Sequence, residues 1–140
     1  ILAHQLQYLR DGVHLVDQAA GNFVDVLLTD PSKIMLVIID TRRYSRQSLL
    51  LATAAQARGI PVTIITDTFC DWGPSVASEV FAVPTELNHF WDSLGPLVSL
   101  VQLAINGVFG QLGATVEDRL SQIFTCYNTF TGYVGTPQED

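Results

Sequence analysis

The chain has 140 residues, of which 48% are hydrophobic and 15% are charged, and its formal net charge at pH 7 is −7. This length corresponds to one domain, and a high apolar content with few charges excludes an intrinsically disordered chain. The acidic balance argues against a general nucleic-acid binder, because neutralising phosphates requires a surplus of lysine and arginine. Three of the seven cations, Arg42, Arg43 and Arg46, nevertheless lie close together in the sequence.

The two cysteines, Cys70 and Cys126, match no spacing that is typical of a metal or redox site. We interpret them as two buried free thiols rather than a disulfide, which suits a reducing cytoplasm. The first residue is Ile1 rather than a methionine, and we expect the sequence to be a piece of a longer protein.

The segment from Ser93 to Val116 carries no charge and is the one candidate for a membrane-spanning helix. A span needs about 20 predominantly apolar residues. This segment also contains a proline, four glycines and several polar residues, namely Ser99, Gln102, Asn106 and Gln111. We therefore expect a buried or subunit-facing helix and no contact with a membrane.

The first part of the chain predicts two helices and a short strand. Apolar residues at helical spacing favour a helix over residues 1–10, which Asp11-Gly12 ends. A short strand is expected over residues 13–16. A second helix is expected over residues 20–28, where Asp30-Pro31-Ser32 breaks it.

The strongest signal is the unbroken apolar run from Ile34 to Ile39, which is typical of a strand buried on both faces of a parallel sheet. A helix rich in leucine and alanine follows over residues 46–58, and Gly59 ends it. A second apolar run extends from Ile60 to Ile65. Strand, helix and strand in this order predict a right-handed βαβ unit.

The remaining elements are a strand over residues 80–83 and two long helices over residues 90–111 and 116–133, before a polar tail at 136–140. This alternation predicts an α/β domain, a three-layer, doubly wound parallel sheet of flavodoxin-like order. Only four strands are found, so we expect the first, central strand to precede Ile1 in the parent protein. The predicted domain covers residues 1–135 and is incomplete at its N-terminal end.

The loop Asp40-Thr41-Arg42-Arg43-Tyr44-Ser45 joins the carboxyl end of a buried strand to the amino end of a helix, and sheets of this kind bind ligands at that edge. Ser45 is the expected N-cap, and the backbone N–H groups and the helix dipole there favour an anion. Arg42 and Arg43 add donors suited to phosphate. The alternative is that both arginines are solvated, or pair with Asp40 and Asp67.

Thr66-Asp67-Thr68 ends the next strand, so its hydroxyls and carboxylate should line the same edge. Asp40 and Asp67 could form a metal site or an acid/base pair, but we favour a salt-bridging role toward the arginines. His4 and His14 offer no metal-ligand spacing. We therefore expect neither a metal nor a cofactor.

The segment from Ile34 to Pro84 resembles the SIS (sugar isomerase) domain, especially that of RpiR/MurR-type bacterial transcription regulators. In that family a strand runs into a Ser-x-Ser-Gly-x-Thr turn and a helix, and the following strand ends in Thr-Asp. The corresponding residues here are Asp40 to Ser45 and Ile64-Ile65-Thr66-Asp67. Phe90-Trp91-Asp92-Ser93 resembles the segment that opens the family's next long helix.

The resemblance implies that hydroxyls and backbone amides of this turn bind a phosphorylated sugar. Ser45 matches the final Thr of the family's turn, while Asp40 and Arg42 replace its two Ser residues and Arg43 replaces its Gly. An arginine at the glycine position removes a residue that tolerates positive φ, which makes an arginine-based grip on an anion reasonable. The predicted ligand-binding residues are Asp40, Thr41, Arg42, Arg43, Ser45, Ser48 and Thr66.

The resemblance thus implies the ligand-sensing domain of a cytoplasmic regulator that binds a phosphorylated sugar or related anion and has no catalytic activity. It further implies a homodimer or higher homo-oligomer, with DNA bound only through a separate N-terminal helix-turn-helix domain. Two alternatives remain open. One is a sugar-phosphate isomerase of the same fold, with Glu117 or His89 as general base, and the other is an SIS-like module that has lost its ligand.

Overall fold

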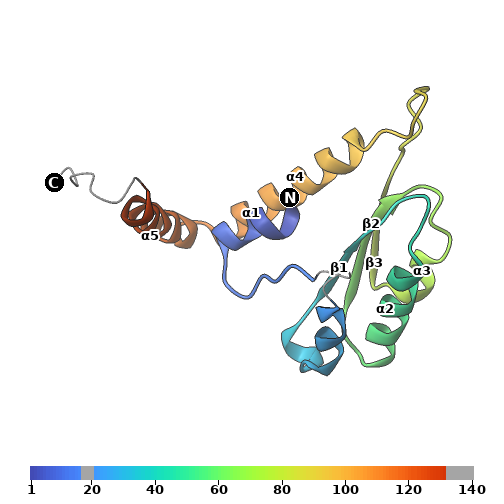
Figure 1. Cartoon of the computed structure of the whole chain (residues 1–140), viewed down its shortest axis with the longest axis horizontal. Helices are drawn as coiled ribbons and strands as arrows, with labels where there is room; N and C mark the ends of the chain where they lie inside the picture. Colours follow the sequence, from blue (N-terminus) through green and yellow to red (C-terminus); the bar gives the residue numbers. More distant parts are fainter. Residues whose placement is uncertain (17–20, 132–140) are drawn as a thin grey trace. The chain divides into compact units, whose positions relative to one another are not determined.

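A computed structural model of the chain describes residues 1–16 and 21–131 (Figure 1). These residues form two compact units. One unit consists of Ile1–Leu15 and the chain from Gln102 onward, and the other is Val16–Val101. The second unit contains the β-sheet and the loop in which the sequence predicts a ligand site.

The sheet has three parallel strands in the order β1-β2-β3, with β1 at Leu36–Ile39, β2 at Val62–Asp67 and β3 at Glu79–Val83. In the register of the sheet, Ile38 lies beside Ile64, and Ile65 lies beside Phe81. Each strand was predicted from its apolar run, and the parallel pairing confirms the predicted α/β class.

Helix α2 (Arg46–Ala57) connects β1 to β2 and covers one face of the sheet. Its small and branched apolar residues are buried against side chains of both strands. The cluster includes Leu36, Ile38, Val62 and Ile64 from the strands and Leu51, Ala52 and Ala55 from the helix. Fully burying a valine, leucine or isoleucine contributes about 1.5–3 kcal/mol, so this cluster is the main source of stability in the second unit.

The opposite face of the sheet is also covered in part. Ile65 points away from the face that carries Ile64, yet it is only 4% exposed. Helix α4 (Gly95–Leu112) begins on this side of the sheet (Figure 1), and Leu97 and Val101 in its first turns are buried. Helices therefore lie on both faces, which confirms the predicted layered arrangement.

The ends of α2 lie where the sequence predicts them. The hydroxyl of Ser45 accepts a hydrogen bond from the backbone N–H of Gln47 and caps the first turn. Gly59 follows the helix with a φ of +74°, a left-handed conformation that favours glycine, and its N–H donates to the carbonyl of Gln56. This turn redirects the chain into β2.

Two of the elements predicted near the N-terminus differ in their secondary structure from the prediction. Residues 13–16 form no strand, and we attribute this to the lack of a neighbouring strand to pair with among the residues that the structure describes. The helix expected over 20–28 is the 3₁₀ helix η1 (Asn22–Leu28), and Ala20 lies outside the described residues. A second short 3₁₀ helix, η2, forms at Pro31–Lys33.

The long helix predicted from residue 90 begins later, at Gly95. Pro96 gives the physical reason, because its ring would clash with the carbonyl four residues earlier if the helix continued back through Asp92. Residues 90–94 are therefore part of the loop between β3 and α4, which lies at the carboxyl ends of the strands. The short helix α3 (Gly73–Val76) follows β2 and was not predicted.

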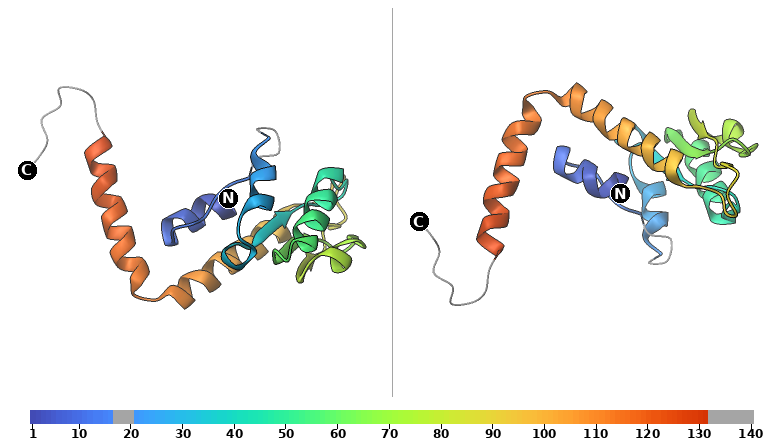
Figure 2. Two further views of the ribbon diagram at one scale, coloured as in Figure 1. Left: turned by 90° about the horizontal axis from the view of Figure 1, so that it is seen from below. Right: turned by 90° about the horizontal axis from the view of Figure 1, so that it is seen from above.

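In the first unit, α1 (Leu2–Leu9) contacts α5 (Thr115–Phe130). The guanidinium of Arg119 joins them: its Nε and Nη2 donate to the carbonyls of Tyr8 and Gln7 at 3.1 and 2.8 Å, and its Nη1 pairs with Asp11 at 2.7 Å. The arginine thus satisfies carbonyls that the end of α1 leaves free. Figure 2 shows the sharp turn between α4 and α5.

By length and composition, α4 could span a membrane, since its 18 residues have a mean hydropathy of 1.3. A single helix of this kind is weak support for a membrane protein, because core helices of soluble proteins meet the same criterion. The burial expected for this segment is confined to Leu97 and Val101.

Both cysteines are free, as predicted. Cys70 is half-buried, whereas Cys126 is exposed, so the predicted burial is wrong for Cys126. Cys126 lies in α5, whose buried residue is Val116.

Candidate functional site

Asp40 closes the loop that leads from β1 into α2. One of its carboxylate oxygens accepts the N–H of Thr41 at 2.9 Å, and the other accepts the N–H of Ser45 at 2.9 Å. Both oxygens therefore hold the backbone of the loop. The prediction that Asp40 pairs with the arginines is wrong, because satisfying backbone N–H groups occupies this carboxylate.

Asp67, the last residue of β2, ties the same loop to the centre of the sheet. It is 1% exposed and accepts hydrogen bonds from the backbone N–H of Arg42 at 2.7 Å, from the N–H of Phe69 at 2.9 Å and from the hydroxyl of Tyr44. Burial raises the pKa of Asp67, but these hydrogen bonds outweigh it and hold the pKa below its ordinary value. The contact with Arg42 is through the backbone, so the predicted salt bridge to its side chain is not formed.

Tyr44 connects the loop to Asp67 and Trp72. Burial raises the pKa of its phenol, and the hydrogen bond to the carboxylate of Asp67 raises it further. The ring also makes an edge contact with Trp72, with 6.0 Å between ring centroids. Tyr44 thus acts as a neutral hydrogen-bond donor that fixes the loop on Asp67.

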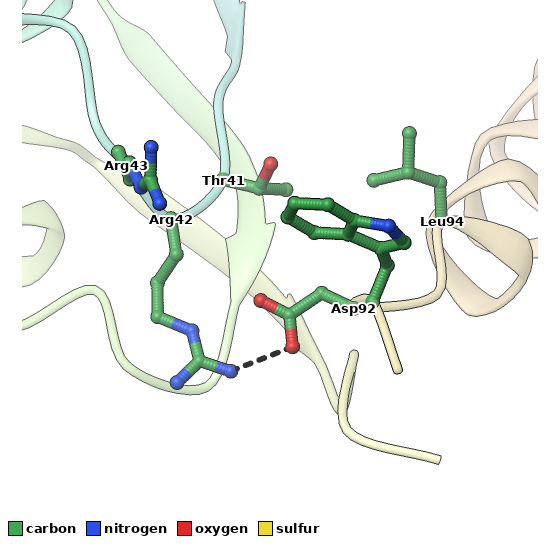
Figure 3. A pocket seen from close by; sticks show the side chains of 6 residues that line it. Thr41, Arg42, Arg43, Asp92 and Leu94 are labelled. Carbon is green, nitrogen blue, oxygen red and sulfur yellow. Dashed lines mark hydrogen bonds and ion pairs between the residues drawn. The ribbon is translucent and has the colours of Figure 1, made fainter. Parts of the chain in front are cut away.

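The side chain of Arg42 extends to the loop that follows β3. Its Nη2 donates to Glu86 at 3.0 Å and to Asp92 at 2.9 Å, and its guanidinium carbon lies 3.9 Å from the ring centroid of Phe69. Figure 3 shows the pair with Asp92. The hydrogen bond to Glu86 is the main cause of a raised pKa for Arg42. The Nε of Arg42 is buried and has no hydrogen-bond partner among the described residues.

An open pocket of about 580 Å³ lies where these loops meet. Its lining combines polar and charged residues from the loop after β1 with aromatic, acidic and apolar residues from the loop after β3. The lining residues are Thr41, Arg42, Arg43, Trp91, Asp92 and Leu94 (Figure 3). Arg43 is exposed and forms no ion pair with any residue in the described part of the chain.

Three of the predicted ligand-binding residues, Thr41, Arg42 and Arg43, are brought together at this pocket. Asp40 and Ser45 lie at the base of the loop, where they hold its backbone and cap α2. Ser48 and Thr66 are 4% and 0% exposed and do not line the pocket. The hydroxyl of Thr66 has no partner among the described residues.

The side of the pocket that comes from the loop after β3 was not predicted from the sequence. This loop, between β3 and α4, contributes Trp91, Asp92 and Leu94 to the pocket lining. It also contains Glu86, which pairs with Arg42. The position of this loop in the sequence could have predicted it. The carboxyl ends of parallel strands lie at the same edge of the sheet, so the segment after β3 is expected near the loop after β1. The helix predicted over residues 90–111 included residues 90–94, which are loop.

The two residues considered as a general base lie in different places. His89 is exposed and lines a smaller cavity of about 360 Å³ formed by the loop after β3. Glu117 lies in the first turn of α5, in the other unit. Residues 1–16 and 21–131 contain no group of three or more histidine, cysteine, aspartate or glutamate side chains that could hold a metal ion.

No protein-family model matches the chain, and no curated protein matches it in sequence. Two solved structures match in fold. The sugar isomerase domain of an RpiR transcription factor from Sphaerobacter thermophilus has a TM-score of 0.75 at 19% identity, covering 89% of this chain and 69% of that one. The Vibrio vulnificus NanR protein, complexed with ManNAc-6P, has a TM-score of 0.74 at 14% identity, covering 94% of this chain and 51% of that one.

The chain thus spans about two thirds of one of these structures and half of the other. At such low identity the likeness concerns the fold, and a TM-score near 0.75 over most of this chain identifies that fold. The parallel sheet, the order of its elements and these neighbours agree with the expected architecture. The chain has the α/β fold of the sugar isomerase domain that occurs in RpiR-type transcription factors.

Proposed function

We propose that this domain binds a phosphorylated sugar, or a closely related anion, in the pocket at the carboxyl end of β1. In this proposal it is the ligand-sensing domain of a bacterial transcription regulator of RpiR type. The observation that carries the proposal is the meeting of Thr41, Arg42 and Arg43 at one pocket, directly before the amino end of α2. The bound ManNAc-6P of the NanR protein is a ligand of the proposed class.

The chemistry of the lining residues suits such a ligand. Arg43 offers a guanidinium with several N–H donors, whose planar geometry matches phosphate oxygens, and Thr41 offers a hydroxyl beside it. Trp91 is 74% exposed and presents an aromatic face to which the apolar side of a sugar ring can bind. A volume of about 580 Å³ lies within the range of small-molecule sites.

The proposed sensor works by differential affinity: the ligand favours one arrangement of a homo-oligomer, and the equilibrium shifts toward that arrangement. DNA would be bound by a separate helix-turn-helix domain, and the net charge of −7 is consistent with a module that does not itself bind DNA. We place the protein in the cytoplasm, where phosphorylated sugars occur and free thiols persist.

Isothermal titration calorimetry with ManNAc-6P, glucose 6-phosphate and their unphosphorylated forms tests the proposal. We expect binding of at least one phosphorylated sugar and a loss of about tenfold or more in affinity in Arg43→Ala, since each charge-assisted hydrogen bond contributes about 1.5–3 kcal/mol. Arg46→Ala is the matched control, because Arg46 is exposed in the first turn of α2 and does not line the pocket.

Binding of no phosphorylated sugar would favour a module that has lost its ligand. Equal affinity in Arg43→Ala and the wild type would show that the pocket is not the binding site. The absence of catalysis is part of the proposal, so each bound sugar phosphate is also incubated with the protein and followed by NMR. Interconversion of an aldose and a ketose phosphate would establish the isomerase instead.

A further inference from the structure

Arg42 forms two ion pairs through a single nitrogen of its guanidinium group. Glu86 and Asp92 both accept from the same atom, Nη2, at 3.0 and 2.9 Å. The Nε atom is buried and has no partner in the part of the chain that the structure describes. The guanidinium is thus neutralised by two carboxylates, while its ability to hold one anion through two parallel hydrogen bonds remains unused.

We propose that Glu86 and Asp92 are built-in counter-ions of Arg42 that an anionic ligand has to replace, so that these two carboxylates determine which anions the pocket accepts. This inference rests on the proposed function, since it concerns the same pocket. Glu86 and Asp92 are thereby specificity-determining residues, which act through Arg42.

The exchange is energetically accessible because the existing ion pairs are exposed. The side chains of Glu86 and Asp92 are 60% and 42% exposed, compared with 32% for Arg42. Pairs of this kind contribute little, because water screens them and two side chains have to be held in place. A phosphomonoester that binds Nη2 replaces two singly charged carboxylates with one group that carries nearly two negative charges.

The same carboxylates disfavour weak anions. A ligand that approaches Arg42 while both carboxylates remain in place meets two negative charges within a few ångströms of its own. A phosphomonoester carries nearly two negative charges at neutral pH and compensates for the displaced carboxylates, whereas a sugar carboxylate carries one. We therefore expect the pocket to prefer glucose 6-phosphate to glucuronate, a sugar acid of similar size.

The loop that carries these carboxylates lies outside the buried part of the sheet. Residues 86–92 are all exposed, and Asp92 lies three residues before Gly95, where α4 begins. In contrast, the backbone of Arg42 is held by the buried carboxylate of Asp67. Exchange of counter-ions thus displaces the loop after β3 and leaves the loop after β1 in place.

The test compares wild type with the double variant Glu86→Gln/Asp92→Asn, using calorimetric titration with inorganic phosphate, glucose 6-phosphate and glucuronate. We expect the double variant to bind phosphate and glucose 6-phosphate about fivefold more tightly, the scale set by exposed ion pairs. We also expect its preference for glucose 6-phosphate over glucuronate to decrease. Asp25→Asn/Glu79→Gln removes the same charge from η1 and from the amino end of β3 and should change neither value.

Adding Arg42→Ala to the double variant should abolish the gain, which assigns it to this guanidinium. An unchanged or lower affinity of the double variant would overturn the exchange, and the proposed function would stand if wild type still bound a sugar phosphate. Binding of inorganic phosphate by the double variant, with no sugar phosphate bound by either protein, would overturn the proposed function and support the exchange. Absence of all binding would overturn both.

Discussion

The phenol of Tyr44 donates a hydrogen bond to the carboxylate of Asp67, and this contact joins the loop after β1 to the carboxyl end of β2. Asp67 is almost completely buried, so the charge of its carboxylate is offset by three donors rather than by water. The loop that lines the pocket is therefore held by Asp67, at the end of the central strand β2.

Replacing Tyr44 with phenylalanine should destabilise the protein by about 1–3 kcal/mol, because it leaves a buried carboxylate with one donor fewer. Urea denaturation followed by circular dichroism measures the change. The matched control is Tyr8→Phe, whose hydroxyl contacts Tyr127 at an exposed position and should contribute less than about 0.5 kcal/mol. Equal effects in the two variants would contradict the proposed anchoring role of Tyr44.

Asp67 should make the protein sensitive to acid. Its folded-state pKa lies below the unfolded value of about 4, so the ionised carboxylate contributes stability above that pH, and this contribution is lost as the pH falls through the folded-state pKa. In Asp67→Asn the contribution is absent at every pH. The free energy of unfolding of wild type and variant, measured from pH 7 to pH 2.5, should therefore converge in acid. Parallel curves would rule out this role.

Replacing Gly59, after α2, and Gly107, within α4, by alanine should change stability in opposite directions. Gly59→Ala should lower the melting temperature, at a cost of about 1 kcal/mol, because alanine disfavours the φ of +74°. Gly107→Ala, in the middle of α4, should raise it, because a Cβ there meets nothing within 4 Å and alanine favours the helix. Differential scanning calorimetry measures both shifts, and a stabilised Gly59→Ala would contradict the left-handed turn.

The carboxylate of Asp40 should be needed for the shape of the pocket loop. Asp40→Ala removes the acceptor for the N–H groups of Thr41 and Ser45, and we expect a loss of about 1–3 kcal/mol. Faster amide hydrogen exchange over residues 41–45 should accompany it. Asp71→Ala is the control, because Asp71 is an exposed carboxylate in the neighbouring loop. Unchanged exchange in Asp40→Ala would mean that the loop keeps its conformation without this carboxylate.

The strands were predictable because their signal is local. The run from Ile34 to Ile39 predicted a strand buried on both faces; Leu36 and Ile38 are buried beneath α2, but Ile39 on the other face is 42% exposed, so the predicted burial holds for one face. Residues 13–16 have a similar apolar character but form no strand. Whether such a segment becomes a strand depends on hydrogen bonds to another strand, which local sequence does not reveal.

The candidate site was predictable in part for the same reason. The position of Arg42 and Arg43 between a buried strand and a capped helix is local, and both residues line the pocket. The partners of Arg42 are 44 and 50 residues away, in a loop whose place depends on how β3 pairs with β2. Sequence reasoning placed the arginines beside Asp40 and Asp67 because it considered nearby charges and overlooked the backbone donors that those carboxylates bind.

The two rims of the pocket differ in how much of the fold depends on them. Changes at Asp40, Tyr44 or Asp67 disturb hydrogen bonds that hold the loop after β1 in place. Residues 86–92 are exposed, and most substitutions at such positions have small effects on stability. Under the proposed function, substitutions in the loop after β3 can therefore change the ligand preference of this domain, while the rim formed by the loop after β1 keeps its structure.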